Sequence, residues 1–221
     1  MKSIVTNGVP QWLCGLVAIG AMSGLMPAAA RGAQTPYVSG QGYAAAVNLA
    51  TGTQQFAGAA LPPEGGMVDA GVDAAAVTST LTASTLNSIT TGMADSAVGS
   101  AQTSAEAADV SILNGLITAR QVLGVAASYV NQQAAGSGAD GSALVDVVVN
   151  GVPLAGTPPP NTRIDLAGVG YVVLNEQTPT GNGVTTSGIS VNMIHVVLRD
   201  ALTGLTTGEI VVGSATSAVA F

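Results

Sequence analysis

The stretch Pro158–Gly183, PPPNTRIDLAGVGYVVLNEQTPTGNG, predicts a pair of β-strands and so decides the fold class. The residues Pro158–Pro160 form a rigid connector, because proline fixes φ at about −65° and donates no N–H. Two short strand-like runs follow, TRIDL and YVVLN, with the sequence AGVG between them. The Asn182-Gly183 pair at the end favours a turn, since both residues accept positive φ. We therefore expect two strands, each followed by a turn.

The sequence on either side shows the same succession of strand-like runs and turn residues. Towards the C-terminus, VNMIHVVLRDAL and EIVVGSATSAVAF predict two further strands. Towards the N-terminus, Asn150-Gly151 and Asn114-Gly115 each lie between apolar runs, which is typical of hairpins. The segment 94–110 contains helix-favouring Ala and Glu, but Ser, Thr and Val at every second position favour a strand. We predict an all-β fold, an antiparallel β-sandwich or β-roll with long strands poor in aromatics; the alternative is an irregular β-solenoid.

Residues 1–30 have the pattern of a secretory signal peptide. A short apolar run, Leu13–Met26, is followed by the small residues Ala28 and Ala30 before the expected cleavage site. The run is shorter than the ~20 residues that a membrane span needs, so no transmembrane segment is expected in the mature chain. We predict a secreted protein associated with the cell surface. Three segments are expected: a signal peptide over 1–30, N-terminal strands with a Pro/Gly loop over 31–71, and a main β domain over 72–221.

The composition excludes several classes of function. Charged residues make up only 8% of the chain, so uncharged polar residues and glycine must cover much of the surface. After residue 30 the sequence has no Cys and no Lys, which excludes disulfides, thiol nucleophiles and Schiff-base lysines there. Twelve acidic residues are present, whereas the basic residues after residue 30 are Arg31, Arg120, Arg163 and Arg199. This balance argues against nucleic acid and anionic membrane surfaces as partners.

Four segments occur in a characteristic order: VNGVPL, PPNTRIDLAGVGYVVLNEQ, VNMIHVVLRDALTG and GEIVVGSATSAV. Together they resemble the bacterial choice-of-anchor P family, most strongly over Ser111–Phe221, where SILNGLITA is similar to the family's first apolar signature. The resemblance implies a secreted surface protein whose domain occurs with different C-terminal anchoring signals. It implies no catalytic residue. The chain ends on a predicted strand without a sorting motif, so covalent attachment to the cell wall is not expected.

Asp165 and Glu176 flank the AGVG break and would approach each other in a hairpin. Paired carboxylates hydrolyse glycosidic bonds when they lie about 5–9 Å apart. Tyr171 is the only aromatic residue nearby, however, and Arg163 offers a simpler role for a carboxylate, a salt bridge. We therefore interpret these charged residues mainly as structural parts of the hairpin.

His195 is the only histidine, and we expect Met193 and Val197 to share its strand face. No motif such as G-x-S-x-G accompanies it, so a structural histidine is the preferred interpretation. No catalytic residue is predicted, and we expect a protein without enzymatic activity.

Loop carboxylates are the remaining candidates for a ligand or calcium site. Asp140, Asp146, Asp165 and Glu176 could each contribute oxygen ligands, which Ca²⁺ prefers. The sequence has no D-x-D-x-D-G loop and no pair of histidines. We therefore predict no metal site and no cofactor, with loop-bound Ca²⁺ as the one exception.

These features favour a secreted, non-enzymatic, structural or adhesive protein of the bacterial surface or extracellular matrix. The expected partners are further copies of the chain, joined through unpaired edge strands, or other surface proteins and polysaccharide. The strand Glu209–Phe221 is the expected exposed edge. The alternative is a carbohydrate- or calcium-binding surface module.

Overall fold

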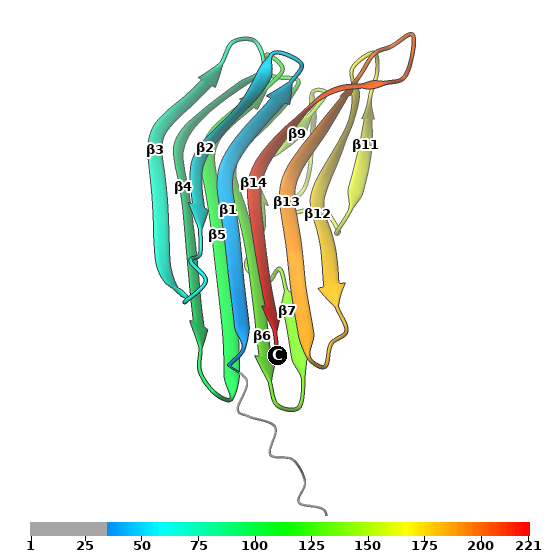
Figure 1. Cartoon of the computed structure of the whole chain (residues 1–221). Helices are drawn as coiled ribbons and strands as arrows, with labels where there is room; N and C mark the ends of the chain where they lie inside the picture. Colours follow the sequence, from blue (N-terminus) through cyan, green and yellow to red (C-terminus); the bar gives the residue numbers. More distant parts are fainter. Residues whose placement is uncertain (1–34) are drawn as a thin grey trace, which may run out of the picture. The chain divides into compact units, whose positions relative to one another are not determined.

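Two antiparallel sheets contain all the strands of the computed structural model, which describes residues 35–221 (Figure 1). The strands of sheet A are β1 (Tyr37–Leu49), β2 (Gly52–Ala60), β11 (Thr162–Leu166), β12 (Gly170–Gly181), β13 (Thr186–Arg199) and β14 (Thr206–Ala220). Those of sheet B are β3 (Gly66–Val77), β4 (Leu81–Ala94), β5 (Val98–Ile112), β6 (Ile117–Asn131), β7 (Ala135–Gly138), β8 (Ala143–Val145), β9 (Val148–Val149) and β10 (Val152–Pro153). No helix is present in this part of the chain.

The two sheets pack face to face. Sheet A has the order β11-β12-β13-β14-β1-β2, and sheet B has the order β10-β9-β6-β5-β4-β3, with β7 and β8 also paired to β6. The strands β1, β13 and β14 of sheet A lie against β4, β5 and β6 of sheet B. This arrangement confirms the predicted antiparallel β-sandwich. The β-solenoid alternative is wrong, because neighbouring strands run antiparallel in both sheets.

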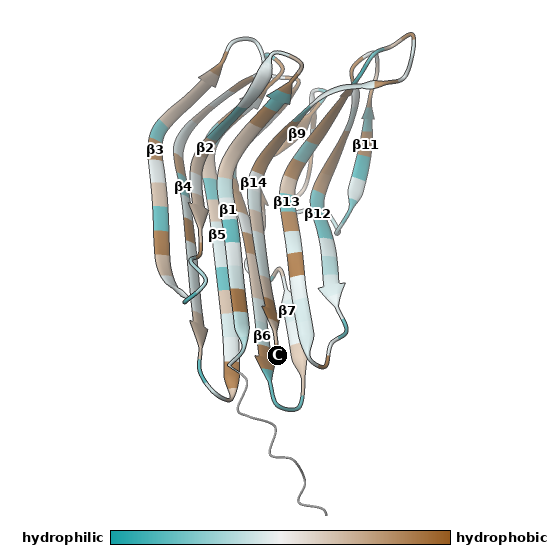
Figure 2. Ribbon diagram, in the orientation of Figure 1, coloured by the Kyte–Doolittle hydropathy of each residue, from teal (hydrophilic) through white to brown (hydrophobic). Residues whose placement is uncertain are grey.

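The alternation of residue types explains why these segments form strands. Along β5, buried and more exposed side chains follow each other almost without interruption from Val98 to Ile112. Successive side chains of a strand point to opposite faces, so one face of each sheet is buried and the other faces water. Figure 2 shows the result as bands of different hydropathy along strands such as β13. The predicted turns at Asn114-Gly115 and Asn150-Gly151 are confirmed, with positive φ at all four residues.

The predicted boundary between residues 71 and 72 is wrong. The strand β3 runs through it, and β1 and β2 are integral parts of sheet A. The described residues, 35–221, all belong to one compact unit. The Pro/Gly loop is confined to 61–65, because the apolar residues that follow pair with β4. The predicted signal peptide lies outside the described residues.

A line of backbone irregularities, here called the crease, crosses both sheets. In sheet A it passes through Ala57, Gly213 and Asn175, whose φ angles are 50°, 68° and 51° and which lie on alternate strands. In sheet B it includes Thr85 and Asp109, both with φ of 47°. A positive φ inside a strand interrupts the regular pleat, so the strand bends and its alternation shifts. In sheet A the register between strands is unchanged at these positions, whereas in sheet B the register of β4 with β5 shifts around Thr85. The strands bend part-way along their length in Figure 1.

Buried hydroxyl groups divide the interior into two apolar regions. The larger region contains Leu86, Ile112, Leu174 and Ile210, and the smaller one lies around Val38. The buried hydroxyls between them belong to Ser88, Thr90, Thr103, Ser128 and Ser217. They bond to one another or to backbone carbonyls. The Thr90 and Thr103 hydroxyls lie 2.9 Å apart, and those of Ser128 and Ser217 lie 2.7 Å apart. Because each hydroxyl has a partner, the cost of burying it is offset.

Candidate functional site

A hydrogen-bonded cluster lies on sheet A beside the crease. Glu176 of β12 accepts a bond from Asn192 Nδ2 of β13 at 2.8 Å, and the same Oε2 lies 2.9 Å from His195 Nδ1. Ser214 of β14 donates to Asn192 Oδ1 at 2.8 Å. The cluster therefore links three neighbouring strands through side chains alone.

The two ionisable groups of this cluster stabilise each other's charge. Their side chains are only 19% (His195) and 27% (Glu176) exposed. The hydrogen bond between them raises the pKa of His195 and lowers the pKa of Glu176, although burial opposes both shifts. The nearby charge of Glu209 also favours the protonated imidazole. In the described part of the chain, His195 Nε2 is buried without a hydrogen-bond partner.

The crease brings these side chains together. At Met193, which lies opposite Gly213, the alternation of β13 shifts without a change of register, so that Asn192 and His195 reach the same carboxylate although they are three residues apart. The prediction that Met193 shares the face of His195 is wrong, because Met193 is fully buried in the core. The carboxylate partner of His195 was missed because a cross-strand register does not follow from the sequence of either strand.

The chemistry available to this cluster is mainly electrostatic. The Ser214 hydroxyl donates to Asn192 and not to the imidazole, so these residues do not form a Ser-His-carboxylate relay. A charge-assisted bond of this kind instead braces β12 against β13.

Asp165 and Glu176 are not brought together by the hairpin. Asp165 lies opposite Tyr171, five residues before Glu176 on β12, which is about 16 Å along a strand. The carboxylate of Asp165 accepts bonds from Arg163 Nε at 3.1 Å and Nη2 at 2.8 Å. The expected salt bridge is thus present, and the paired-carboxylate arrangement of a glycosidase is not formed by these two residues.

A second charged cluster surrounds Tyr171. The guanidinium of Arg163 lies 3.9 Å from the centre of the Tyr171 ring, and that of Arg199 lies 5.0 Å from it. These residues come from β11, β12 and β13, three adjacent strands of sheet A. Sequence reasoning missed the role of Arg199, which is 36 residues from Arg163 and reaches the ring only through strand pairing.

The predicted calcium positions are dispersed. Asp146 forms a salt bridge with Arg120 at 2.6 Å, and Asp140 lies in the exposed turn before β8. Within residues 35–221, no three His, Cys, Asp or Glu side chains are grouped so that they could hold a metal ion. Loop-bound Ca²⁺ therefore stays a prediction without a defined set of ligands.

The expected exposed edge at Glu209–Phe221 is wrong, because β14 is a central strand. It pairs with β1 along one side and with β13 along the other. The long unpaired edge is instead β3, whose only partner in sheet B is β4. An edge strand of this length presents a row of free backbone groups to a neighbouring chain.

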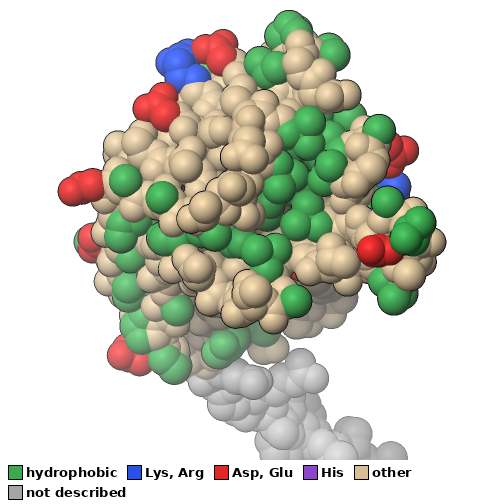
Figure 3. Space-filling model, turned by 90° about the horizontal axis from the view of Figure 1, so that it is seen from above, with side chains coloured by type: hydrophobic (Ala, Val, Ile, Leu, Met, Phe, Trp, Pro, Cys, Tyr) green, Lys and Arg blue, Asp and Glu red, His purple; other side chains and the backbone are tan. Residues whose placement is uncertain are grey.

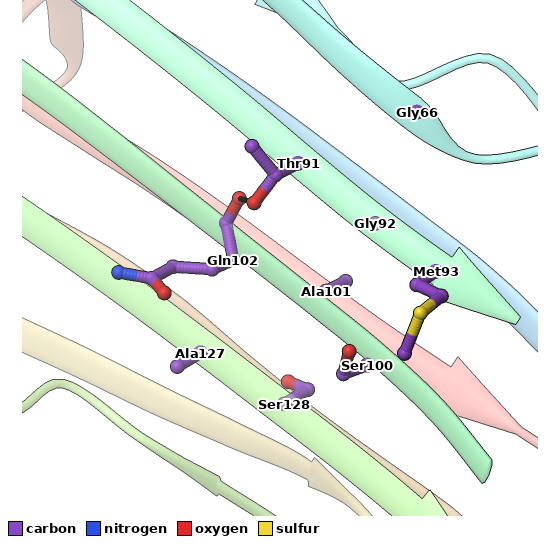
Figure 4. Close-up of a pocket in the computed structure, with 9 residues that line it drawn as sticks. All are labelled: Gly66, Thr91, Gly92, Met93, Ser100, Ala101, Gln102, Ala127 and Ser128. Carbon is purple, nitrogen blue, oxygen red and sulfur yellow. Dashed lines mark hydrogen bonds between the residues drawn. The ribbon is translucent and has the colours of Figure 1, made fainter.

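The outer face of sheet B beside this edge carries an apolar patch, defined by Met67, Ile89, Met93, Val98 and Tyr129. Their exposed fractions range from 39% to 69%. Met93 faces Ser100, and Ser100 faces Tyr129, so side chains of three adjacent strands form one row. A shallow hollow of about 290 Å³ lies next to Met93 of this patch, lined by residues of β3–β6 (Figure 4). Apolar groups clustered in this way are typical of interaction surfaces.

Charged side chains are sparse on the face of the molecule seen in Figure 3. Figure 3 shows a few acidic and basic groups scattered among uncharged and apolar side chains. Among the described residues, no helix is long and apolar enough to span a membrane.

No protein-family model matches this chain, and no curated protein or solved structure resembles it significantly. The resemblance to the choice-of-anchor P family therefore stays a prediction.

Proposed function

We propose that this chain is a secreted, non-enzymatic, structural or adhesive protein of the bacterial surface or matrix that associates with copies of itself. The observation that carries the proposal is the unpaired edge strand β3 beside the apolar patch of sheet B. A flat sheet edge offers backbone hydrogen bonds, and the exposed apolar side chains next to it add contact area that excludes water.

The sparse charge of the chain supports the same proposal. Native proteins protect long edges with charged side chains, especially lysine, and the only charged side chains of β3 are Asp69 and Asp73. The cluster at His195 supports a structural role, since its hydrogen bonds connect strands within sheet A. The carbohydrate- or calcium-binding alternative stays a prediction.

Sedimentation velocity of the purified chain over a wide concentration range tests self-association. We expect the sedimentation coefficient to rise with concentration, and we expect a Met67→Lys/Met93→Lys variant to associate at least tenfold more weakly. The lysines place charge within the apolar patch, where association would have to bury it. A Val184→Lys/Leu202→Lys variant is the matched control, because both of its sites are exposed apolar residues in loops.

The control variant should associate like the wild type. A wild-type chain that stays monomeric at the highest concentration would contradict the proposal. Equal association of all three proteins would show that the apolar patch is not the contact.

A further inference from the structure

Charge is divided unevenly between the two sides of the sandwich. Residues 35–119, which contain β1–β5 and the start of β6, have six acidic residues and no Lys or Arg. Residues 120–221 contain six acidic residues together with Arg120, Arg163 and Arg199. The strands β2 and β3 are the edges of their sheets on one side, and β11 is the edge of sheet A on the other (Figure 1). One side is therefore only acidic, and every described cation comes from β6 onward.

The arginines beside Tyr171 have unused capacity to bind carboxylates. Arg163 directs both of its bonds to a single oxygen, Asp165 Oδ1. Arg199 is exposed and forms no ion pair within the described residues. A guanidinium has five N–H donors, and its contact with an aromatic face orients it without neutralising its charge. The two arginines thus present oriented donors at the β11 side of the sandwich.

The opposite edge has the complementary groups. Asp69 and Asp73 lie on β3, and both are exposed. Neither makes a salt bridge or a side-chain hydrogen bond within residues 35–221. Their carboxylates stand on β3, the longest of the described strands that have a free edge.

We propose that Arg163 and Arg199 bind the acidic edge of a second copy of this chain, through its Asp69 and Asp73. The inference rests on the proposed self-association and specifies its contact. Donor and acceptor groups lie on opposite sides of the same sandwich, so the contact is head-to-tail. A head-to-tail contact leaves a free binding edge at each end and extends into an open chain of copies.

Charge reversal at the two edges separates this contact from any other mode of association. An Arg163→Asp/Arg199→Asp variant has two acidic edges, and an Asp69→Arg/Asp73→Arg variant has two basic edges. Each should associate at least tenfold more weakly than the wild type in sedimentation velocity at 50 mM salt. An equimolar mixture of the two should regain wild-type association, because every contact then joins an acidic edge to a basic one.

Two single variants serve as controls of charge alone. Arg120→Asp changes an arginine that is already paired with Asp146, and Asp140→Arg changes an exposed turn residue. Both should associate like the wild type. Circular dichroism melts test whether each variant is folded. If a charge-reversed protein is unfolded, the neutral variants Arg199→Gln and Asp69→Asn replace it, and each should also associate more weakly than the wild type.

The outcomes distinguish this inference from the proposed function. Wild-type association that survives both reversals leaves self-association in place and overturns the contact proposed here. A wild-type chain that never associates overturns both. Binding of an acidic polysaccharide that requires Arg163 and Arg199, without association of the chain, assigns the cluster to a different partner and also overturns the inference.

Discussion

At the scale of single residues, protonation and folding are linked at the pair His195–Glu176, where the pKa of both groups shifts on folding. A group whose pKa is raised by folding stabilises the folded state below its unfolded pKa, and that stabilisation is lost as the pH rises through the folded value. This is the case of His195, whose ordinary pKa is 6.5. A group with a lowered pKa behaves in the opposite sense, and Glu176 loses its contribution as the pH falls below 4.5 through its folded value.

The pair should therefore stabilise the fold most between about pH 4.5 and pH 6.5. We expect His195→Gln to lower the free energy of unfolding by about 1 kcal/mol in this window and by less above it. Urea unfolding of the wild type and the variant at several pH values measures the difference. Glu176→Gln should remove the same pH-dependent component, and a difference that stays constant from pH 5 to pH 9 would contradict the assignment.

Residue types predicted some contacts of the candidate sites and not others. The Arg163–Asp165 salt bridge could be predicted because the two residues are neighbours on one strand face. The contacts of Glu176 with His195, and of Arg199 with Tyr171, join residues on different strands. Such contacts depend on the register between strands, which does not follow from the residue types of either strand alone.

At the scale of elements, strand identity could be predicted because period-two alternation and Asn-Gly turns are local signals. The crease could not be predicted as a whole, since two of its positive φ angles fall on Ala57 and Thr85, which are not typical of that conformation. The order of the strands in each sheet could not be predicted either, because local sequence signals do not show which strands pair. Because β14 is the last strand in the sequence, we expect it from the sequence alone at the edge of its sheet. In the structure it lies between β1 and β13 and pairs with both.

At one position, Asn175, the contribution of the crease to the stability of the fold can be measured directly. Asn175 has φ of 51° and is only 6% exposed, and its amide donates to Pro158 O at 2.9 Å. We expect Asn175→Ala to destabilise the fold by about 2 kcal/mol, because alanine disfavours this φ and leaves the Pro158 carbonyl without its donor. Asn175→Gly should cost less, since glycine accepts the positive φ.

Chemical unfolding of the two variants separates the two causes. The difference between them reports the strain of the backbone, and the remaining loss in Asn175→Gly reports the hydrogen bond. Equal losses in both variants would contradict a backbone role for this position.

At the scale of the whole sandwich, the first and last strands of the described chain are neighbours in sheet A. β14 pairs with β1 over nearly its full length, so the last strand in the sequence closes sheet A against the first. The same strand lies against β5 and β6 of sheet B. Its side chains Ile210, Val212, Ala215 and Val219 are buried and contribute to both apolar regions of the core.

Removal of β14 should therefore unfold the sandwich and not merely shorten it. A chain that ends at Leu205 would leave β1 and β13 without their shared partner and expose the aliphatic core between the sheets. We expect this truncated chain to lack a cooperative urea transition and near-ultraviolet dichroism, and we expect a peptide of residues 206–221 added in trans to restore both by strand addition. If β14 were the exposed edge that its position in the sequence suggests, the truncated chain would keep a cooperative transition, and that result would contradict the central placement of this strand.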